Sequence, residues 1–178
     1  MKRRRLRRSI PFGSNNFLSV LEGMEGGFAI FAGIVIGLSF EGVNRELLLL
    51  TATISIVVNA INASAVRFST EHYLDELDGH EKRSWFKAYF IPALIEFVAY
   101  LVVSLISLLP LLWVASLTTA ILLSVIITTI ILFCAGYYRG ALLSRHHAVR
   151  DGIETAGLGL LIITAGGVSG WLISTFIV

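Results

Sequence analysis

The sequence predicts an all-α membrane protein with five transmembrane helices. Of its 178 residues, 56% are hydrophobic and only 15% are charged, whereas about 25% of the residues in a soluble domain are charged. The apolar residues gather in five runs, and each run has the roughly 20 residues that a helix needs to cross the hydrocarbon core of a bilayer. The five runs are residues 17–40, 47–67, 86–109, 115–137 and 153–178.

The segments between these runs are too short to form a second domain. We therefore expect one five-helix domain, residues 17–178, behind a tail at residues 1–16. The tail begins "MKRRRLRR", and it lacks the short apolar core and small-residue cleavage site of a signal peptide. We interpret it as a retained cytoplasmic tail that contacts anionic lipid. The single cysteine, Cys134, lies in the fourth run and excludes an internal disulfide.

The distribution of basic residues predicts the orientation in the membrane. Thirteen of the fourteen Lys and Arg residues lie in the tail, in the connection between the second and third runs, or in the connection between the fourth and fifth. Only Arg45 lies in the turn after the first run. Cytoplasmic loops carry an excess of Lys and Arg, so we expect a cytoplasmic N-terminus and, after five spans, a C-terminus outside.

The first run carries two carboxylates in the stretch "EGMEGGFAIFAG", Glu22 and Glu25. An intramembrane carboxylate costs roughly 2.5–3.5 kcal/mol on insertion scales, so it persists where it faces protein, water or an ion. Helical spacing places both acids on one stripe with Gly33 and Gly37, a small-xxx-small pair that lets another helix approach closely. Two interpretations stay open: an ion or proton site at this seam, or acids at the inner interface that are solvated or paired with arginines.

The second run, "SIVVNAINASAVRF", places Ser55, Asn59, Asn62 and Val66 along one helical face. Asparagine side chains can join helices through hydrogen bonds worth about 0.6 kcal/mol each. Their amide oxygens are also ligands that hard cations accept together with carboxylates. Asn59 and Asn62 therefore serve either as interhelical glue or as the lining of an ion pathway.

The third run carries Glu96, about ten residues from its start. Tyr100 and Ser104 follow on the same face, and Pro92 lies one turn earlier, where its missing N–H frees a backbone carbonyl. An ionisable residue inside a span indicates a functional site by default. The alternative is a protonated, hydrogen-bonded acid with a structural role.

The connection "STEHYLDELDGHEKR" would bring His72, Glu76 and His80 onto one face if the second helix continued through it. That arrangement would form a metal-binding edge. Gly79 is expected to fray the last turn, however, so a solvated amphipathic loop is the favoured interpretation.

Sequence motifs of enzymes are missing from the chain. We find no GxSxG, HExxH, CxxC or phosphate-loop pattern, and no apolar run contains a histidine. Intramembrane hydrolysis would need a buried Ser–His or Asp–Asp pair. We therefore expect no enzyme activity.

Several segments together resemble the vacuolar iron transporter family, small five-span proteins that act as dimers and exchange divalent iron or manganese for protons. "EGMEGGFAIFAG" is similar to the family's opening pattern, with Glu22 at the position of an aspartate and Gly33 at a distal glycine. "VNAINASAVRFST" is similar to its second-helix stretch, and "LISLLPLLW" to the end of its third helix. "ILFCAGYYRGALLSRHHAVRDGIETAGLGLLIITAGGVSGWLI" follows its fourth-to-fifth-helix pattern.

The chain departs from this family at the functional positions. Glu22 replaces an aspartate and lengthens the arm, whereas Ala63 stands where the family has a methionine, a soft metal ligand. Asn62 replaces a serine, and Arg67 replaces a glutamate and so reverses the charge. The acidic soluble domain that many members insert after the second helix is reduced to about 15 residues. These departures weaken the expectation that iron is the substrate, and they do not remove the expectation that the protein is a transporter.

The resemblance implies a homodimer that exchanges a divalent cation, carried as a substrate and not held as a cofactor, for protons. Glu22 and Glu25 from two copies would face each other across the glycine-lined seam, where crowded carboxylates hold protons that an arriving cation displaces. All-oxygen ligands would favour manganese, iron(II) or even magnesium or calcium over zinc or copper. The predicted metal ligands are Glu22, Glu25, Asn59, Asn62 and Glu96.

Two other functions stay open. The chain could be a non-transporting scaffold or regulator in which Arg67 neutralises Glu22 or Glu25 as a static ion pair. Transport of a small cationic solute ranks last, because the aromatic residues are too diffuse to form a cage.

The expected partners are a second copy, a divalent metal ion with protons, and membrane lipid, with no nucleic acid. The expected location is a prokaryotic plasma membrane.

Overall fold

Long apolar segments of this chain fold into helices that follow one another with short connections. The computed structural model describes residues 13–79, 84–143 and 147–176, so most of the predicted tail and His80 lie outside the described residues. The elements are α1 (Ser14–Ser39), α2 (Arg45–Leu77), η1 (Phe86–Phe90), α3 (Ile91–Trp113), α4 (Leu117–Leu143) and α5 (Ala148–Phe176). Five helices are long and apolar enough to cross a membrane, which confirms the predicted all-α class and number of spans.

The second helix extends well beyond its predicted apolar window of 47–67. It starts at an N-cap in which the Asn44 side chain accepts a hydrogen bond from the Leu47 N–H at 2.9 Å. It ends only at Leu77, because Gly79 adopts a φ of +70° and the Asp78 and Gly79 amides donate to the last carbonyls. The polar residues that follow the apolar window therefore continue the helix.

The third span contains two prolines that the helix tolerates differently. Pro92 lies in the first turn of α3 and has no N–H to donate to the preceding turn. The backbone of that turn is π-helical, and the Ile91 N–H donates to the Phe86 carbonyl. Pro110 lies in the last turns of α3, which ends at Trp113. The helix therefore extends past the apolar run 86–109, and residues 114–116 separate α3 from α4.

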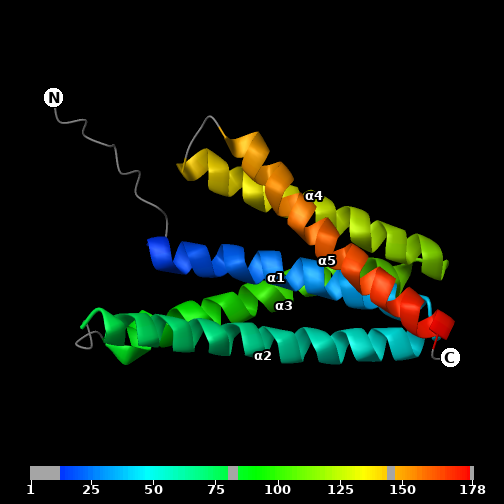
Figure 1. The fold of residues 1–178 in the computed structure, drawn as a ribbon, viewed down its shortest axis with the longest axis horizontal. Coiled ribbons are helices and arrows are strands. Elements are labelled where there is room, and N and C mark those ends of the chain that lie inside the picture. The colour runs from blue at the N-terminus through cyan, green and yellow to red at the C-terminus, as the bar shows by residue number, and fades with distance from the viewer. Residues whose placement is uncertain (1–12, 80–83, 144–146, 177–178) are drawn as a thin grey trace.

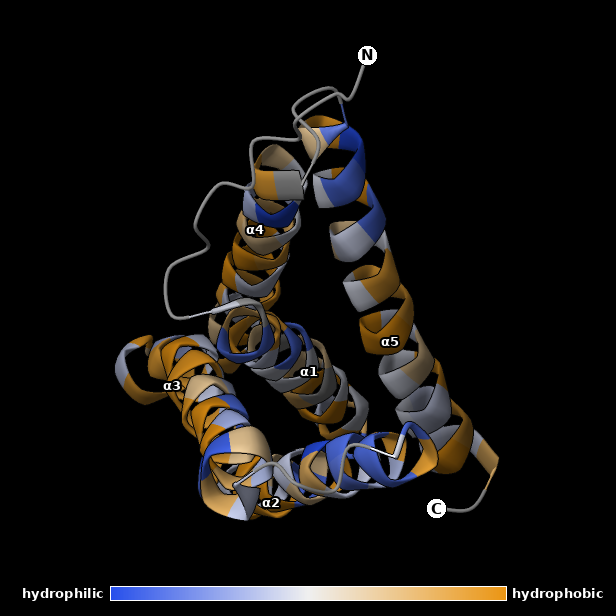
Figure 2. Ribbon diagram, turned by 90° about the vertical axis from the view of Figure 1, so that its left-hand side faces the viewer, coloured by the Kyte–Doolittle hydropathy of each residue, from blue (hydrophilic) through white to orange (hydrophobic). Residues whose placement is uncertain are grey.

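α1 is the central helix of the molecule. The other four long helices are arranged around it (Figure 2), and each of them contacts it. The α2–α3 pair and the α4–α5 pair spread apart towards the end where α1 begins (Figure 1). At the opposite end Arg45 donates to the carbonyls of Val114 and Ala115, at 2.6 and 2.7 Å, and so joins the two short turns.

Glycines determine how closely α1 packs against α5. A Cβ added at Gly33 would lie 3.2 Å from the Ile162 carbonyl oxygen, and one at Gly37 would lie 2.9 Å from the Gly166 carbonyl oxygen. Another helix does approach this small-xxx-small pair, as predicted, but it is α5 of the same chain. Gly33 and Gly37 are thus covered within the protomer, which corrects the expectation that they line a seam between two copies.

Large apolar side chains remain exposed on the outer helices. Fewer than a third of the residues in the apolar windows of α2, α4 and α5 are buried within the chain. A soluble monomer rarely exposes so much contiguous apolar surface, whereas lipid tails are a suitable environment for it. Examples of these exposed side chains are Leu50, Ile54, Val58, Leu122, Ile126, Ile130, Leu158 and Leu161.

Candidate functional site

A pocket of about 440 Å³ lies between α1, α2 and α3. It gathers four of the five predicted ligands, Glu22 from α1, Asn59 and Asn62 from α2, and Glu96 from α3. Its other lining residues are Gly26, Ala63, Val66, Arg67, Thr70 and Tyr100. The chain therefore concentrates the polar groups of three spans in one place.

Close packing of α1 on α3 brings Glu22 and Glu96 to the same pocket. A Cβ at Gly23 would lie only 2.5 Å from the Glu96 backbone oxygen, and one at Gly27 would lie 2.8 Å from the Tyr100 backbone oxygen. The Ser104 hydroxyl donates to the Gly27 carbonyl at 3.0 Å across the same contact. Any side chain larger than hydrogen at these glycines would push the two helices, and with them the two acids, apart.

Glu96 is the most deeply buried acid of the pocket. It is 6% exposed, and its Oε2 atom is buried without a hydrogen-bond partner among the described residues. Tyr100 and Ser104 are buried beside it on the same face of α3, as predicted. A buried carboxylate oxygen without a partner costs free energy that hydrogen bonding normally offsets, so this atom is a natural ligand for a proton or a cation.

The two asparagines of α2 differ in their surroundings. The Asn59 side-chain nitrogen donates to the Ser55 carbonyl of its own helix at 2.9 Å, which leaves its amide oxygen as an acceptor. Asn62 is exposed in the single chain. The hydrogen bond of Asn59 lies within α2, so it does not have the geometry expected of interhelical glue.

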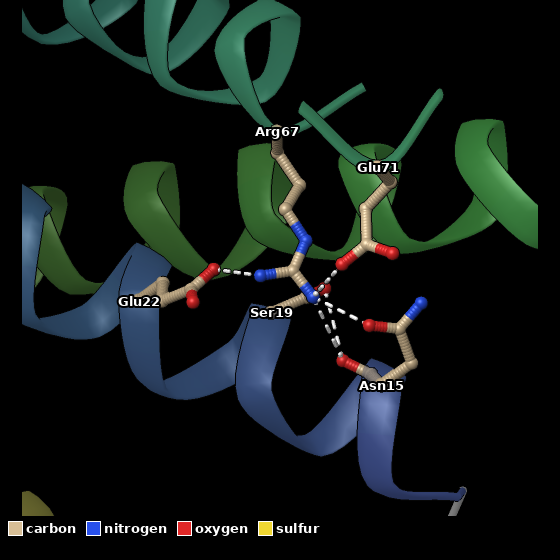
Figure 3. Close-up of polar contacts among 5 residues, drawn as sticks. All are labelled: Asn15, Ser19, Glu22, Arg67 and Glu71. Atoms are coloured by element: carbon tan, nitrogen blue, oxygen red, sulfur yellow. Dashed lines mark hydrogen bonds and ion pairs between the residues drawn. The ribbon is translucent and has the colours of Figure 1, made fainter. Parts of the chain in front are cut away.

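Arg67, which lines the pocket, reaches from α2 to α1 (Figure 3). Its Nη1 donates to Glu22 Oε2, and its Nη2 donates to Asn15 Oδ1 at 2.6 Å and lies 3.2 Å from Glu71 Oε1. The Arg67 side chain is only 9% exposed, whereas that of Glu22 is 48% exposed. Glu22 is therefore already paired with a cation in this structure, as expected of the scaffold alternative.

Glu25 contacts other helices than Glu22 does. Arg139 of α4 donates to Glu25 Oε1 at 3.0 Å and to Thr155 Oγ1 of α5 at 3.2 Å. Three residues along a helix leave about 60° between two side chains, and this angle directs Glu22 towards α2 and Glu25 towards α4 and α5. Within one chain the two acids therefore contact different helices, and the meeting of Glu22 and Glu25 from two copies stays a prediction.

Other candidate ligands do not assemble into a metal centre. His72 Nε2 lies 3.7 Å from Glu76 Oε1, and the His72 ring packs against Phe68 and Tyr89. Within residues 13–79, 84–143 and 147–176, no three His, Cys, Asp or Glu side chains form a group that could hold a metal ion. One chain thus offers two carboxylates and two amides around its pocket, and not a closed ligand shell.

A family model described as the VIT family matches residues 57–171, from the middle of α2 to the end of α5. The chain belongs to the VIT family. This confirms the resemblance to vacuolar iron transporters and places the protein among metal-ion transporters. Together with five apolar helices it identifies an integral, multi-pass membrane protein. No curated protein sequence matches the chain.

The VIT match includes the α2 and α3 sides of the pocket and not the α1 side. Asn59, Asn62, Arg67 and Glu96 lie within the matched residues, whereas Glu22 lies before them. The four positions at which the resemblance implies a departure from the family, Glu22, Asn62, Ala63 and Arg67, all line the pocket. The implied differences are therefore concentrated at this site.

Sequence reasoning offered the Arg67–Glu22 pair of this VIT protein only as part of the scaffold alternative, and it missed the contacts of Arg67 with Asn15 and Glu71. The spacing of Arg67 and Glu71, four residues apart on one helix, was a usable signal for their pairing. No local signal indicates that Arg67 reaches Asn15, or that Arg139 reaches Glu25, because these pairs are 52 and 114 residues apart in the chain.

Proposed function

We propose that the protein transports a divalent metal cation, manganese or iron(II), across a membrane in exchange for protons. The observation that carries the proposal is the buried Oε2 of Glu96, which has no partner among the described residues, in a pocket that also contains Glu22, Asn59 and Asn62. Oxygen donors of these types suit hard and borderline divalent cations. A carboxyl group that lacks a partner can hold a proton in one state and ligate a cation in the next.

We further propose that two copies form a homodimer that completes the site. The pocket of one chain has too few acidic ligands to enclose a metal, and Asn62 and Glu22 are exposed on its open side. Polar groups in a span are costly when they face lipid. A second copy covering this side would shield them and would contribute its own carboxylates.

Proteoliposome transport tests the proposal. We expect Mn²⁺ uptake that a proton gradient stimulates, and a loss of at least about tenfold in Glu22→Gln and Glu96→Gln, since each removes a charged ligand. Glu154→Gln is the matched control, because Glu154 is exposed and pairs with Arg150 on its own helix. Uptake at the control level in both Glu22→Gln and Glu22→Ala would remove Glu22 from the mechanism.

The second candidate function is a non-transporting scaffold or regulator. The ion pair between Arg67 and Glu22 favours it, because it leaves Glu22 without a vacant oxygen pair for a metal. Thermal unfolding of the detergent-purified protein separates the two functions. A transporter should gain stability in micromolar Mn²⁺ by mass action, whereas a scaffold should keep the same melting temperature.

A further inference from the structure

Arg67 stands in the pocket at the position where a cation would meet Glu22. Its guanidinium bridges Glu22 and Asn15 of α1 and Glu71 of α2, and the side chain is almost fully buried. The remaining ring of polar groups, Glu96 and the asparagines, surrounds the same space. The pocket thus already contains one positive charge supplied by the protein.

This guanidinium is not fully satisfied in its present position. Arg67 Nε is buried and has no hydrogen-bond partner among the described residues. A buried donor without a partner destabilises the arrangement that buries it. Glu71 lies one helical turn further along α2, so Arg67 can release Glu22 and still keep an acidic partner on its own helix.

We propose that Arg67 is a tethered competitor of the transported metal, and that a divalent cation binds Glu22 only after displacing the Arg67 guanidinium towards Glu71. This inference rests on the proposed transport function and adds a regulatory step to the same pocket. A metal ion and a guanidinium close together repel each other strongly in a poorly hydrated site. The observed metal affinity then depends on how much more strongly the metal ion than the Arg67 guanidinium binds the Glu22 carboxylate.

A purely structural role for Arg67 predicts the opposite result. If the guanidinium only clamps α1 to α2, its removal should loosen the pocket and weaken metal binding or leave it unchanged. If it competes with the metal, its removal should strengthen binding, even if the protein becomes less stable. The two roles therefore differ in the sign of one measurement.

Calorimetric titration of the detergent-purified protein with Mn²⁺ provides that measurement. We expect Arg67→Gln to bind Mn²⁺ about tenfold more tightly than the wild type, Arg67→Lys to fall between them, and Glu22→Gln to lose binding. Equal or weaker binding by Arg67→Gln, with wild-type binding still abolished by Glu22→Gln, would overturn the competition and keep the metal site. No binding by either wild type or Arg67→Gln would overturn the proposed transport function as well.

A second test uses the wild-type chain and so does not depend on how the variants fold. Phenylglyoxal modifies accessible arginines, and peptide mass spectrometry reads the rate at each one. We expect Mn²⁺ to accelerate modification of Arg67 several-fold, because displacement exposes it. Arg150, which is exposed and paired with Glu154, is the internal control and should be unaffected. An unchanged rate at Arg67 in millimolar Mn²⁺ would overturn the inference.

Discussion

Single residues of the pocket differ in how well their polar atoms are satisfied. Asn59 satisfies its nitrogen within α2, whereas Glu96 Oε2 and Arg67 Nε are buried without partners among the described residues. Intramembrane polar groups are costly, which is why the sequence alone was sufficient to select Glu22, Asn59, Asn62 and Glu96. It was not sufficient to say which of them would be left unsatisfied, because that depends on atoms of other helices.

Replacing Glu96 with glutamine should separate its function from its contribution to stability. The change keeps the shape of the side chain and removes a buried acid, so the melting temperature in detergent should stay the same or rise. Mn²⁺ affinity should fall at least about tenfold, because a charged ligand becomes a neutral amide. Differential scanning fluorimetry and calorimetric titration measure the two effects, and Glu154→Gln is the control. Unchanged Mn²⁺ affinity would show that Glu96 is a structural acid.

Pairs of helices are held at distances set by small residues. The α1–α5 contact joins Gly33 and Gly37 to Gly166 and Gly170, and the α1–α3 contact uses Gly23 and Gly27. The small-xxx-small pattern predicts that some helix approaches closely. The pattern does not indicate which helix that is, since α3, α5 or a second copy would all satisfy it equally. The predicted inter-subunit seam is for this reason an internal contact.

Valine at Gly170 should disrupt the α1–α5 contact. Its Cβ would collide with the backbone of Gly37, which cannot move without shifting α1, and overpacking of this kind costs about 1–3 kcal/mol. Gly157 of the same helix is the matched control, because a Cβ there meets no atom within 4 Å. Thermal unfolding in detergent should show a lower melting temperature for Gly170→Val and little change for Gly157→Val. Equal melting temperatures would contradict the packing described.

The Glu25–Arg139 ion pair should link α1 to α4 with modest energy. Both side chains are about one-third exposed, at 31% and 32%, so solvent weakens the pair and we expect a coupling of about 1 kcal/mol. A double-mutant cycle with Glu25→Gln and Arg139→Gln, followed by denaturant unfolding, measures it. Zero coupling would mean that the two side chains do not interact in solution.

At the scale of the whole molecule, alternating helices place the helix ends that border the basic connections at one end. The start of α1, the end of α2 and the start of α5 lie at this end, although apart from one another, and the turns containing Val114 and Arg45 lie at the other end (Figure 1). With the bias of basic residues towards the cytoplasm, this arrangement supports the proposal that the N-terminus is cytoplasmic. Glu22 and Glu25, in the first half of α1, would then open towards the cytoplasmic side.

Cysteine labelling in intact cells tests this orientation. Ser84 and Ser116 are exposed residues at opposite ends of the molecule, and Cys134 is replaced by serine because it is a free, exposed thiol. A membrane-impermeant maleimide should label Ser116→Cys and leave Ser84→Cys unlabelled until the membrane is permeabilised. The reverse pattern would place the N-terminus outside and reject the proposed orientation.

The sequence by itself determined that this protein has five helices long and apolar enough to cross a membrane, and at which positions polar residues interrupt them, because hydropathy depends on residue type and spacing. It also carried the family resemblance that the comparison confirmed. Tertiary structure alone decided the rest: that Gly33 and Gly37 pack on α5, that Glu22 and Glu25 diverge, and that Arg67 and Arg139 reach them. These outcomes depend on the rotation and distance of neighbouring helices, which no local pattern encodes.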